Sequence, residues 1–393
     1  KIDASKIGID VLKKGGNAID AAVAVGFALS VTHSGAGNLG GGGFAVIRLA
    51  DGTVTSVDFR ETAPILSKKD MFLNDNGDVI PGLSWSSSLS SGVPGTVAGL
   101  GYIHEKYGSM QWETLVYPSI VLAKYGFELD HHTVSVLNSK KYKSKLSYDS
   151  ETKKIFTKEK DFNIGDIFIQ EDLSNTLMRI AQYGHKEFYY GETSDLILDC
   201  MSRINGIITI DDLHNYKPIE KEPIHGTYRG YNVYSMPPSS SGGITLINIL
   251  NQIENLDIKS LGFHSSAHVH YLVESEKRAY SDRAVYLGDT QYVDVPIDYL
   301  ISKDYAYERF KEINHLYATE GSLIYQTNLN ENEESEETTH FSIIDSFGNA
   351  VSITTTLNGW YGNGVTVDEA GFLLNMEWMI FLLNQDIQMH MVL

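Results

Sequence analysis

Three polar residues late in the chain have the types and spacing that nucleophilic catalysis needs. Thr338 follows an acidic run, residues 331–337, and opens a segment that alternates like a β-strand, while Thr356 and Asn358 close the segment that returns. A threonine hydroxyl becomes a competent nucleophile when a base lies within hydrogen-bond reach. If the chain were cut before Thr338, its own α-amine would be that base, with a pKa near neutrality.

The segment that starts at Thr338 predicts a β-hairpin with its turn at residues 346–349. In one register Thr339 lies opposite Thr356, whereas a one-residue slip or bulge places Thr356 beside Thr338. Both registers gather the three polar residues at the end where the acidic run joins. The alternative is a plain edge hairpin whose threonines serve only β propensity.

Arg60 is a candidate for binding a carboxylate. It ends a predicted strand in VDFRETAP, where Val57 and Phe59 alternate with Asp58 and Arg60, so Arg60 shares a face with Asp58. Arg60 therefore forms either a structural ion pair with Asp58 or a bidentate clamp on a substrate carboxylate. The spacing alone leaves both interpretations open.

Two further clusters have residue types that occur in binding sites. The glycine-rich stretch 34–44 lacks the Gly-Lys-Ser/Thr ending of a phosphate-binding loop and lies between a helix and a strand, which favours a loop with close backbone approach. His264 and His268 are four residues apart, but a metal site needs a further ligand, so a surface or capping role is expected. No metal site is predicted.

The composition limits the partners. A formal net charge of −19 over 393 residues repels nucleic acid and anionic membranes. The single cysteine, Cys200, excludes an internal disulfide framework and a Cys-rich zinc site. The best candidate for a membrane span, AIDAAVAVGFALSV, is interrupted by Asp20, so no span is predicted. The chain begins at Lys1 with neither a methionine nor a signal peptide, which indicates processing or a fragment.

The elements that must position these residues follow from the hydrophobic pattern. The amino-terminal part predicts a helix, a two-glycine break, an Ala-rich helix packed inside the fold, and two strands joined by an Asp-Gly turn. Helices dominate from about Thr96 to Cys200, and a later long helix carries residues 276–283 as a solvated, salt-bridged face. Residues 318–337 are polar and acidic and predict an exposed linker.

The chain resembles the γ-glutamyltranspeptidase (glutathione hydrolase) family over nearly its whole length. The motifs that carry the resemblance occur in the family's order: LKKGGNAIDAAVA, GGGGF, DFRETAP, SGVPGTVAGL, MPPSSSGGI, EKRAYSDRAVYLGD and TTHFSIIDSFGNAVSITTTLN. The resemblance implies an α+β N-terminal-nucleophile hydrolase fold, a four-layer αββα sandwich, which would be incomplete at its carboxyl end. It implies a large-subunit region 1–337 and a small-subunit region that begins with residues 338–375.

The same resemblance assigns roles to the residues singled out above. Self-cleavage falls between Glu337 and Thr338, and Thr338 then attacks a γ-glutamyl amide to form a γ-glutamyl-enzyme. Thr356 matches the threonine that supports the nucleophile. Arg60 matches the arginine that holds the substrate α-carboxylate, and Asn358 matches a residue at the glutamyl head. No metal or organic cofactor is implied.

The tail 376–393 departs from the family pattern. Where the family continues with GFLLNN and a MDDFS motif, this chain has GFLLNMEWMIFLLNQDIQMHMVL. Codons written for the tail, with one adenine restored after Asn375 and the frame shifted, give NNGMDDFSAKPGYPNAYGL. We therefore expect a frameshifted tail and a truncated, inactive product, and sequencing of the gene decides the point.

The resemblance predicts γ-glutamyl transfer or hydrolysis on glutathione or related γ-glutamyl amides. The acceptor is an amino acid, a peptide or water, and cleavage would give a heterodimer of large and small subunits. A periplasmic or secreted location is implied. The alternative is a non-catalytic remnant that binds a γ-glutamyl group or a partner.

Overall fold

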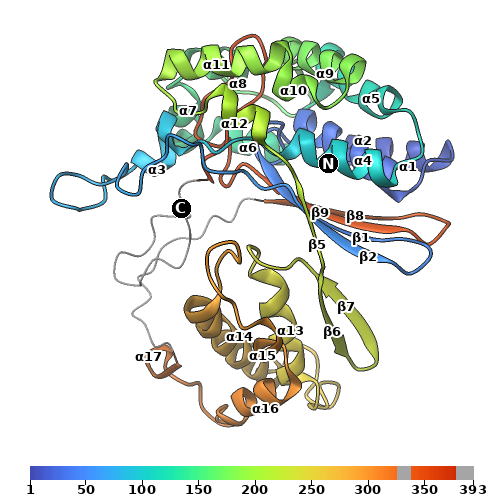
Figure 1. The fold of residues 1–393 in the computed structure, drawn as a ribbon, viewed down its shortest axis with the longest axis vertical. Helices are drawn as coiled ribbons and strands as arrows, with labels where there is room; N and C mark the ends of the chain where they lie inside the picture. Colours follow the sequence, from blue (N-terminus) through green and yellow to red (C-terminus); the bar gives the residue numbers. More distant parts are fainter. Residues whose placement is uncertain (325–337, 378–393) are drawn as a thin grey trace.

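The computed structural model describes residues 1–324 and 338–377. An upper body consists of helices above a β-sheet, and a lower lobe of helices and one hairpin lies below that sheet (Figure 1). The predicted linker 318–337 falls mainly outside the described residues, although helix α17, Gly321–Ile324, forms inside its start. Within the described ranges, no helix combines the length and the apolar character that a membrane crossing requires.

The sheet of the upper body has five antiparallel strands in the order β5-β2-β1-β9-β8. The first two strands and the late hairpin are therefore formed as predicted, and β9 lies between β1 and β8. The strand bounds are β1 Gly42–Arg48, β2 Val54–Asp58, β5 Ile219–Lys221, β8 Thr339–Ile344 and β9 Ala350–Thr356.

The hairpin register follows from its turn. Asp345 accepts the backbone N–H groups of Phe347 and Asn349, each at 2.9 Å, and also that of Ala18 at the start of helix α2. Asp345 is thus held in the turn, and the last strand pair is Ile344 with Ala350. Thr339 consequently pairs with Thr355, so the register with Thr339 opposite Thr356 is wrong and the one-residue slip is confirmed.

The Ala-rich helix α2, Ala18–Thr32, lies at the centre of the upper body. All of its residues are buried, as predicted, because small side chains allow α1, α4 and α5 to approach it closely. Asn17 and Asp20 form a capping box at its amino end. The neighbouring helices are α1 Ile2–Lys13, α4 Thr96–Tyr107 and α5 Trp112–Tyr125.

The rest of the upper body is mainly helical, which confirms the helical region predicted from about Thr96 to Cys200. Its elements are α3 Leu83–Ser86, the 3₁₀-helix Ser88–Ser90, β3 Phe127–Glu128, α6 His131–Asn138, α7 Lys140–Leu146, α8 Ser150–Phe156, β4 Ile167–Phe168, α9 Glu171–Tyr183, α10 Glu187–Tyr190, α11 Glu192–Ile204 and α12 Ile210–Asn215.

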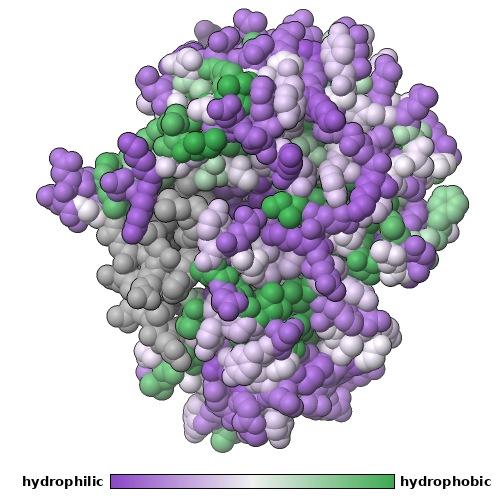
Figure 2. All heavy atoms as spheres, in the orientation of Figure 1, coloured by the Kyte–Doolittle hydropathy of each residue, from purple (hydrophilic) through white to green (hydrophobic). Residues whose placement is uncertain are grey.

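The lower lobe has a small hydrophobic core of its own, and Figure 2 shows that the lobe also exposes hydrophobic residues. A groove of about 650 Å³ runs between α13 and α14, with Leu246, Val273 and Tyr280 in its lining. The lobe comprises β6 Ile224–Tyr228, β7 Tyr231–Ser235, α13 Gly242–Ile253, α14 Ser266–Tyr286, α15 Ile297–Leu300, α16 Lys303–Lys311 and α17.

Helix α14 contradicts one prediction, because residues 276–283 do not form a fully solvated face. Arg278 is only 1 % exposed and forms an ion pair at 2.9 Å with Glu274, which is equally buried. Arg278 also donates to the backbone oxygen of Glu312 at 2.9 Å. The charged pattern therefore contains a buried pair that ties α14 to the end of α16, since burial of an arginine requires a partner.

The glycine-rich stretch is a close-packing element, in agreement with the predicted loop of close backbone approach. A Cβ on Gly41 would overlap the carbonyl oxygen of Thr356, and a Cβ on Gly43 would overlap that of Thr354. A Cβ on Gly40 would meet the carbonyl oxygen of Leu373. The absence of side chains here allows β1 to lie against β9 and against the segment that follows it.

Gly43→Ala should therefore destabilise the upper body, because the added methyl group meets backbone that cannot rotate away. We expect a loss of about 2 kcal/mol or more in the free energy of unfolding, measured by urea denaturation. Gly242→Ala is the matched control, since a Cβ there meets its nearest atom at 3.5 Å. Equal losses in the two variants would contradict the packing argument.

Candidate active site

Strand pairing brings the predicted site residues to one end of the sheet. Gly42 pairs with Thr356, and the next position of the β8 register sets Thr338 beside Thr356. The guanidinium carbon of Arg60 lies 5.6 Å from the ring centre of Phe44, whose β-pairing partner is Thr354. Arg60 and the two threonines therefore share the face of the sheet that carries Phe44. Strand β1 lies between β2 and β9, and adjacent strands are spaced about 4.8 Å apart.

The hydroxyl-bearing side of the site is formed by Thr338, Thr356 and Asn358. Thr338 is exposed at the entry to β8. The hydroxyl oxygen of Thr356 accepts the backbone N–H of Asn358 at 2.9 Å, which fixes the turn after β9. Asn358 itself has a φ of 69°, a left-handed conformation that asparagine tolerates better than most residues. Glu337, the other predicted side of the cleavage site, lies outside the described residues.

Arg60 does not form an ion pair with Asp58, which was one of the two interpretations that the spacing left open. Its guanidinium donates to the carboxylate of Glu377 instead. Asp58 accepts the backbone N–H of Arg60 at 3.1 Å and forms an ion pair with Lys221 at 2.8 Å. The carboxylate of Asp58 thus holds the backbone after β2, and the guanidinium of Arg60 reaches a different acid.

A second acid, Glu61, lies beside this pair and was not found from the sequence. Both of its carboxyl oxygens are buried, and neither has a hydrogen-bond partner among the described residues. Burial first, and the charge of Glu377 second, raise the pKa of Glu61 well above its usual value. Burial would lower the pKa of Arg60, but Glu377 raises it, so the guanidinium stays charged. The cluster therefore consists of one guanidinium and two carboxyl groups, and the guanidinium contacts the carboxylate of Glu377.

Alternation gives no signal for Glu61, because continuing it past Arg60 would place Glu61 on the opposite face. The chain leaves β2 at Asp58, and alternation no longer applies beyond that point. Glu377 was also missed, since it lies in the tail 376–393 that was predicted not to follow the family. The rest of that tail lies outside the described residues.

The segment Asn375–Glu377 is fixed against the site by backbone hydrogen bonds. The side chain of Asn375 donates to the carbonyl oxygens of Gly40 and Gly92, each at 2.8 Å. The backbone N–H of Met376 donates to Leu357 at 3.1 Å. The side-chain amide of Asn358 in turn donates to the carbonyl oxygen of Met376 at 3.1 Å. One short segment thus contacts both Arg60 and Asn358.

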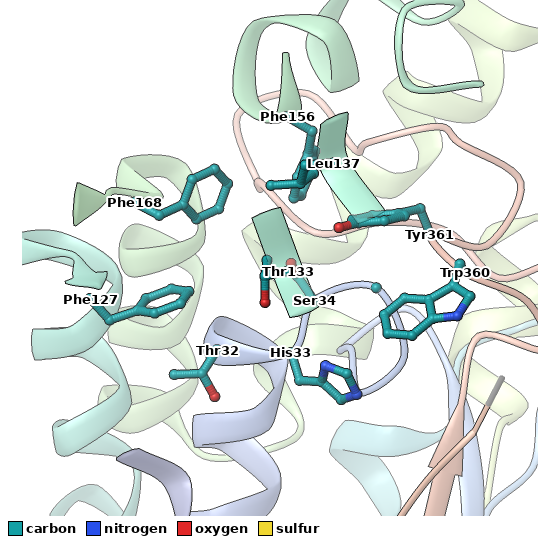
Figure 3. A pocket seen from close by; sticks show the side chains of 11 residues that line it. Thr32, His33, Ser34, Phe127, Thr133, Leu137, Phe156, Phe168, Trp360 and Tyr361 are labelled. Carbon is teal, nitrogen blue, oxygen red and sulfur yellow. The ribbon is translucent and has the colours of Figure 1, made fainter. Parts of the chain in front are cut away.

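A small cavity of about 10 Å³ lies behind the loop that carries Asn358. Figure 3 shows His33 and Trp360 at one side of it, and their ring centres are 5.2 Å apart in an edge-to-face arrangement. The backbone N–H of Tyr361 donates to Gly35 at 2.8 Å. Burial, followed by the charge of Lys1, lowers the pKa of His33 to about 4. A neutral imidazole therefore supports this loop near neutral pH.

The candidate histidines lie in the lower lobe. His264 and His268 have ring centres 6.3 Å apart, and the backbone N–H of His264 donates to the ring of His268. In the part of the chain that the structure describes, no three His, Cys, Asp or Glu residues are grouped to hold a metal ion. Cys200 is buried, and its thiol pKa is raised to about 12, mainly by that burial.

The family model for gamma-glutamyltranspeptidase matches residues 4–391. The chain belongs to the γ-glutamyltranspeptidase family. It is 46 % identical over 376 residues to the glutathione hydrolase proenzyme of Escherichia coli K12, with 95 % of this chain and 64 % of that protein covered. It is 44 % identical over 374 residues to the glutathione hydrolase proenzyme of Pseudomonas sp. strain A14, with 95 % and 65 % covered.

Solved structures also support the membership of this chain in the γ-glutamyltranspeptidase family. The structure of Helicobacter pylori γ-glutamyltranspeptidase superposes with a TM-score of 0.80 at 45 % identity, and the match covers 84 % of this chain and 96 % of that chain. Cephalosporin acylase from Bacillus halodurans gives 0.84 at 24 % identity, covering 98 % and 69 %, which indicates the fold alone. The expected α+β N-terminal-nucleophile hydrolase fold is thus confirmed. The chain spans about two thirds of the length of its curated relatives, 64 % and 65 % for these two.

The pKa of His33 predicts a loss of stability in acid. Since the pKa of His33 in the folded chain is below the ordinary histidine value of 6.5, the unfolded chain binds more protons below pH 6.5, and stability falls as the pH drops towards 4. Between pH 7 and pH 5 this group should cost about 2 kcal/mol of unfolding free energy. His33→Phe keeps an aromatic ring but has no group that titrates in this range. Between pH 7 and pH 5 its free energy of unfolding should therefore fall by about 2 kcal/mol less than that of the parent protein. Equal pH dependence in urea unfolding of the two proteins would contradict this account.

Proposed function

We propose that this chain carries the threonine nucleophile and the carboxylate-binding residues for γ-glutamyl transfer or hydrolysis. The observation that carries the proposal is the convergence of Arg60, Thr356, Asn358 and the Thr338 position on one face and one end of the sheet. Family membership supplies the reaction class. The two bacterial relatives described above are glutathione hydrolases, so glutathione and related γ-glutamyl amides are the proposed donors.

The proposed chemistry begins with cleavage of the bond between Glu337 and Thr338. The freed α-amine of Thr338 accepts the hydroxyl proton as the oxygen attacks the γ-carbonyl carbon. The amide C–N bond breaks, the leaving amine takes that proton, and a γ-glutamyl ester on Thr338 remains. Water, or the amine of an amino acid or peptide, then attacks the ester and releases Thr338. Arg60 holds the donor α-carboxylate, Asn358 contacts the glutamyl head, and Thr356 supports the nucleophile.

Cleavage would leave a large and a small subunit as a heterodimer, the proposed state of the active protein. The proposed acceptors are water, amino acids and peptides, and a periplasmic or secreted location follows from the family. No step of the proposed reaction needs a metal or an organic cofactor.

Thr338→Ala tests the nucleophile. In the chain extended by the segment that its relatives carry, the parent should split into fragments of residues 1–337 and 338 onward and release a chromogenic amine from a γ-glutamyl anilide. Thr338→Ala should stay intact and lose at least about 10³-fold in rate, because no hydroxyl remains to attack. Thr338→Ser is the control that keeps a hydroxyl and should still split. Turnover by an intact Thr338→Ala chain would overturn the assignment.

Arg60→Lys tests the carboxylate clamp. Lysine keeps the positive charge but loses the planar pair of donors, so KM for a γ-glutamyl anilide should rise about 10-fold or more while kcat changes less. A substrate analogue without the α-carboxylate should show no such difference between the two proteins. Arg48→Lys is a control on an exposed arginine of the same sheet. An unchanged KM in Arg60→Lys would remove Arg60 from the site.

A second candidate function is a non-catalytic remnant that still binds a γ-glutamyl group or a partner. The contact between Arg60 and Glu377 favours it, because a guanidinium held by the chain's own acid does not bind substrate directly. An uncut chain that unfolds cooperatively and releases no amine would support the remnant. Splitting at Thr338 with turnover would support the enzyme.

A further inference from the structure

The backbone of Arg60 is held on both sides by side chains. The hydroxyl of Tyr216 donates to the carbonyl oxygen of Arg60 at 2.7 Å, and the carboxylate of Asp58 accepts the backbone N–H of Arg60 at 3.1 Å. Strand β2 ends at Asp58, so Arg60 lies outside the strand ladder. The two side-chain hydrogen bonds therefore do for Arg60 what β-pairing does for the residues before it.

The hydroxyl of Tyr216 reaches Arg60 because the start of helix α4 has no side chain in the way. A Cβ on Gly95 would overlap both the hydroxyl of Tyr216 and the carbonyl oxygen of Phe59. The ring of Tyr216 stacks on that of Tyr189, with ring centres 5.7 Å apart and 7° between the ring planes. The stacked ring and the glycine together direct the hydroxyl at Arg60.

Lys221 supports Arg60 from the other side, through Asp58. Its ammonium group forms an ion pair with Asp58 at 2.8 Å and donates to the carbonyl oxygen of Pro238 at 3.0 Å. The side chains of Lys221 and Asp58 are only 15 % and 11 % exposed, so this pair is shielded from water. Lys221 therefore balances the charge of Asp58, and the guanidinium of Arg60 is not required as its partner.

Tyr216 and Lys221 belong to one short segment, residues 216–221, which ends in strand β5 at the edge of the sheet. Strand β5 pairs with β2, and Lys221 lies opposite Ser56. The hydroxyl of Ser56 donates to the carbonyl oxygen of Lys221 at 2.8 Å. After β5 the chain continues into β6 of the lower lobe (Figure 1). The segment that joins the two bodies is thus fixed to β2 and holds Arg60 from both sides.

We propose that Tyr216 and Lys221 are positioning residues for Arg60. Tyr216 fixes the carbonyl side of Arg60, while Lys221, through Asp58, fixes the N–H side and keeps the guanidinium free of Asp58. The inference rests on the proposed function for the identity of the ligand, a γ-glutamyl donor with an α-carboxylate. A side chain on a fixed backbone loses less freedom when it binds, so both residues strengthen carboxylate binding without contacting the ligand.

Tyr216→Phe tests the carbonyl side, because it removes one hydroxyl and keeps the stacked ring. Two quantities are measured on the full chain: the dissociation constant for L-glutamate, from calorimetry, and the rate at which phenylglyoxal modifies Arg60, followed by peptide mass spectrometry. The dissociation constant should rise about 5-fold or more. The Arg60 side chain is 22 % exposed, and its modification should become several-fold faster because a less fixed side chain samples more exposed positions.

Tyr189→Phe is the matched control. It removes the other hydroxyl of the stacked pair, which donates to the carbonyl oxygen of Pro94 at 2.8 Å rather than to Arg60. A general loss of packing would change both variants alike, whereas a positioning role changes Tyr216→Phe alone. γ-Aminobutyrate, which lacks the α-carboxylate, is the matched ligand, and its affinity should be equal in the parent and in Tyr216→Phe.

Lys221→Gln tests the N–H side by the same two quantities. It leaves the charge of Asp58 unpaired two residues from Arg60, so the guanidinium is drawn towards Asp58 and the dissociation constant for L-glutamate should rise about 10-fold. Adding Asp58→Asn removes that charge, keeps an oxygen that accepts the N–H of Arg60, and should restore most of the affinity. Lys221→Arg keeps the cation and should resemble the parent. Thermal unfolding identifies the variants that are folded.

The outcomes separate this inference from the proposed function. Weaker L-glutamate binding and faster modification in Tyr216→Phe, with both unchanged in Tyr189→Phe, support the positioning role. Faster modification in Tyr216→Phe with no glutamate binding by the parent keeps the positioning role and overturns the γ-glutamyl site. Parent-like values in Tyr216→Phe, or equal changes in Tyr189→Phe, overturn the role of Tyr216. Parent-like values in Lys221→Gln, or no recovery on adding Asp58→Asn, overturn the role of Lys221.

Discussion

The antiparallel pairing of β1 with β9 is the contact on which the candidate site depends. It joins residues about three hundred positions apart and continues through β8 on one side and β2 on the other. This pairing sets Thr356 opposite Gly42 and brings the entry of β8 to the end of the sheet where β2 leads to Arg60. Glycine at the start of β1 is required because any Cβ there would meet a carbonyl oxygen of the neighbouring backbone. The pairing and close packing of the backbone therefore set the positions of the site residues.

Much of this arrangement is predictable from local sequence pattern. The alternation in β8 and β9, the Asp-Gly turn after β1 and the uniformly small, apolar character of α2 each specify an element, and each element is present. The register of the hairpin was left open because it depends on Asp345, whose carboxylate binds turn N–H groups and the start of α2 at the same time. A contact with a helix more than three hundred residues away is not visible in a strand pattern.

The charges were harder to predict than the backbone. Alternation makes Asp58 a reasonable partner for Arg60, but Lys221 of β5 forms the ion pair with the carboxylate of Asp58. Glu61 and Glu377 meet Arg60 only because the chain turns after β2 and the segment after β9 folds back. The pair of Arg278 with Glu274 is a local i, i+4 contact within α14, and only the contact of Arg278 with Glu312 at the end of α16, which helps to bury it, is long-range. Long-range ion pairing is not encoded in periodicity.

The central proposal is that this end of the sheet binds the glutamyl head of a γ-glutamyl donor beside Thr338. A crystal structure of the protein grown with a saturating concentration of L-glutamate tests it most directly. Density is expected for the glutamate α-carboxylate on the guanidinium of Arg60, with the γ-carboxyl directed towards Thr338. Glutamate bound elsewhere, with no density at Arg60, would contradict the proposal.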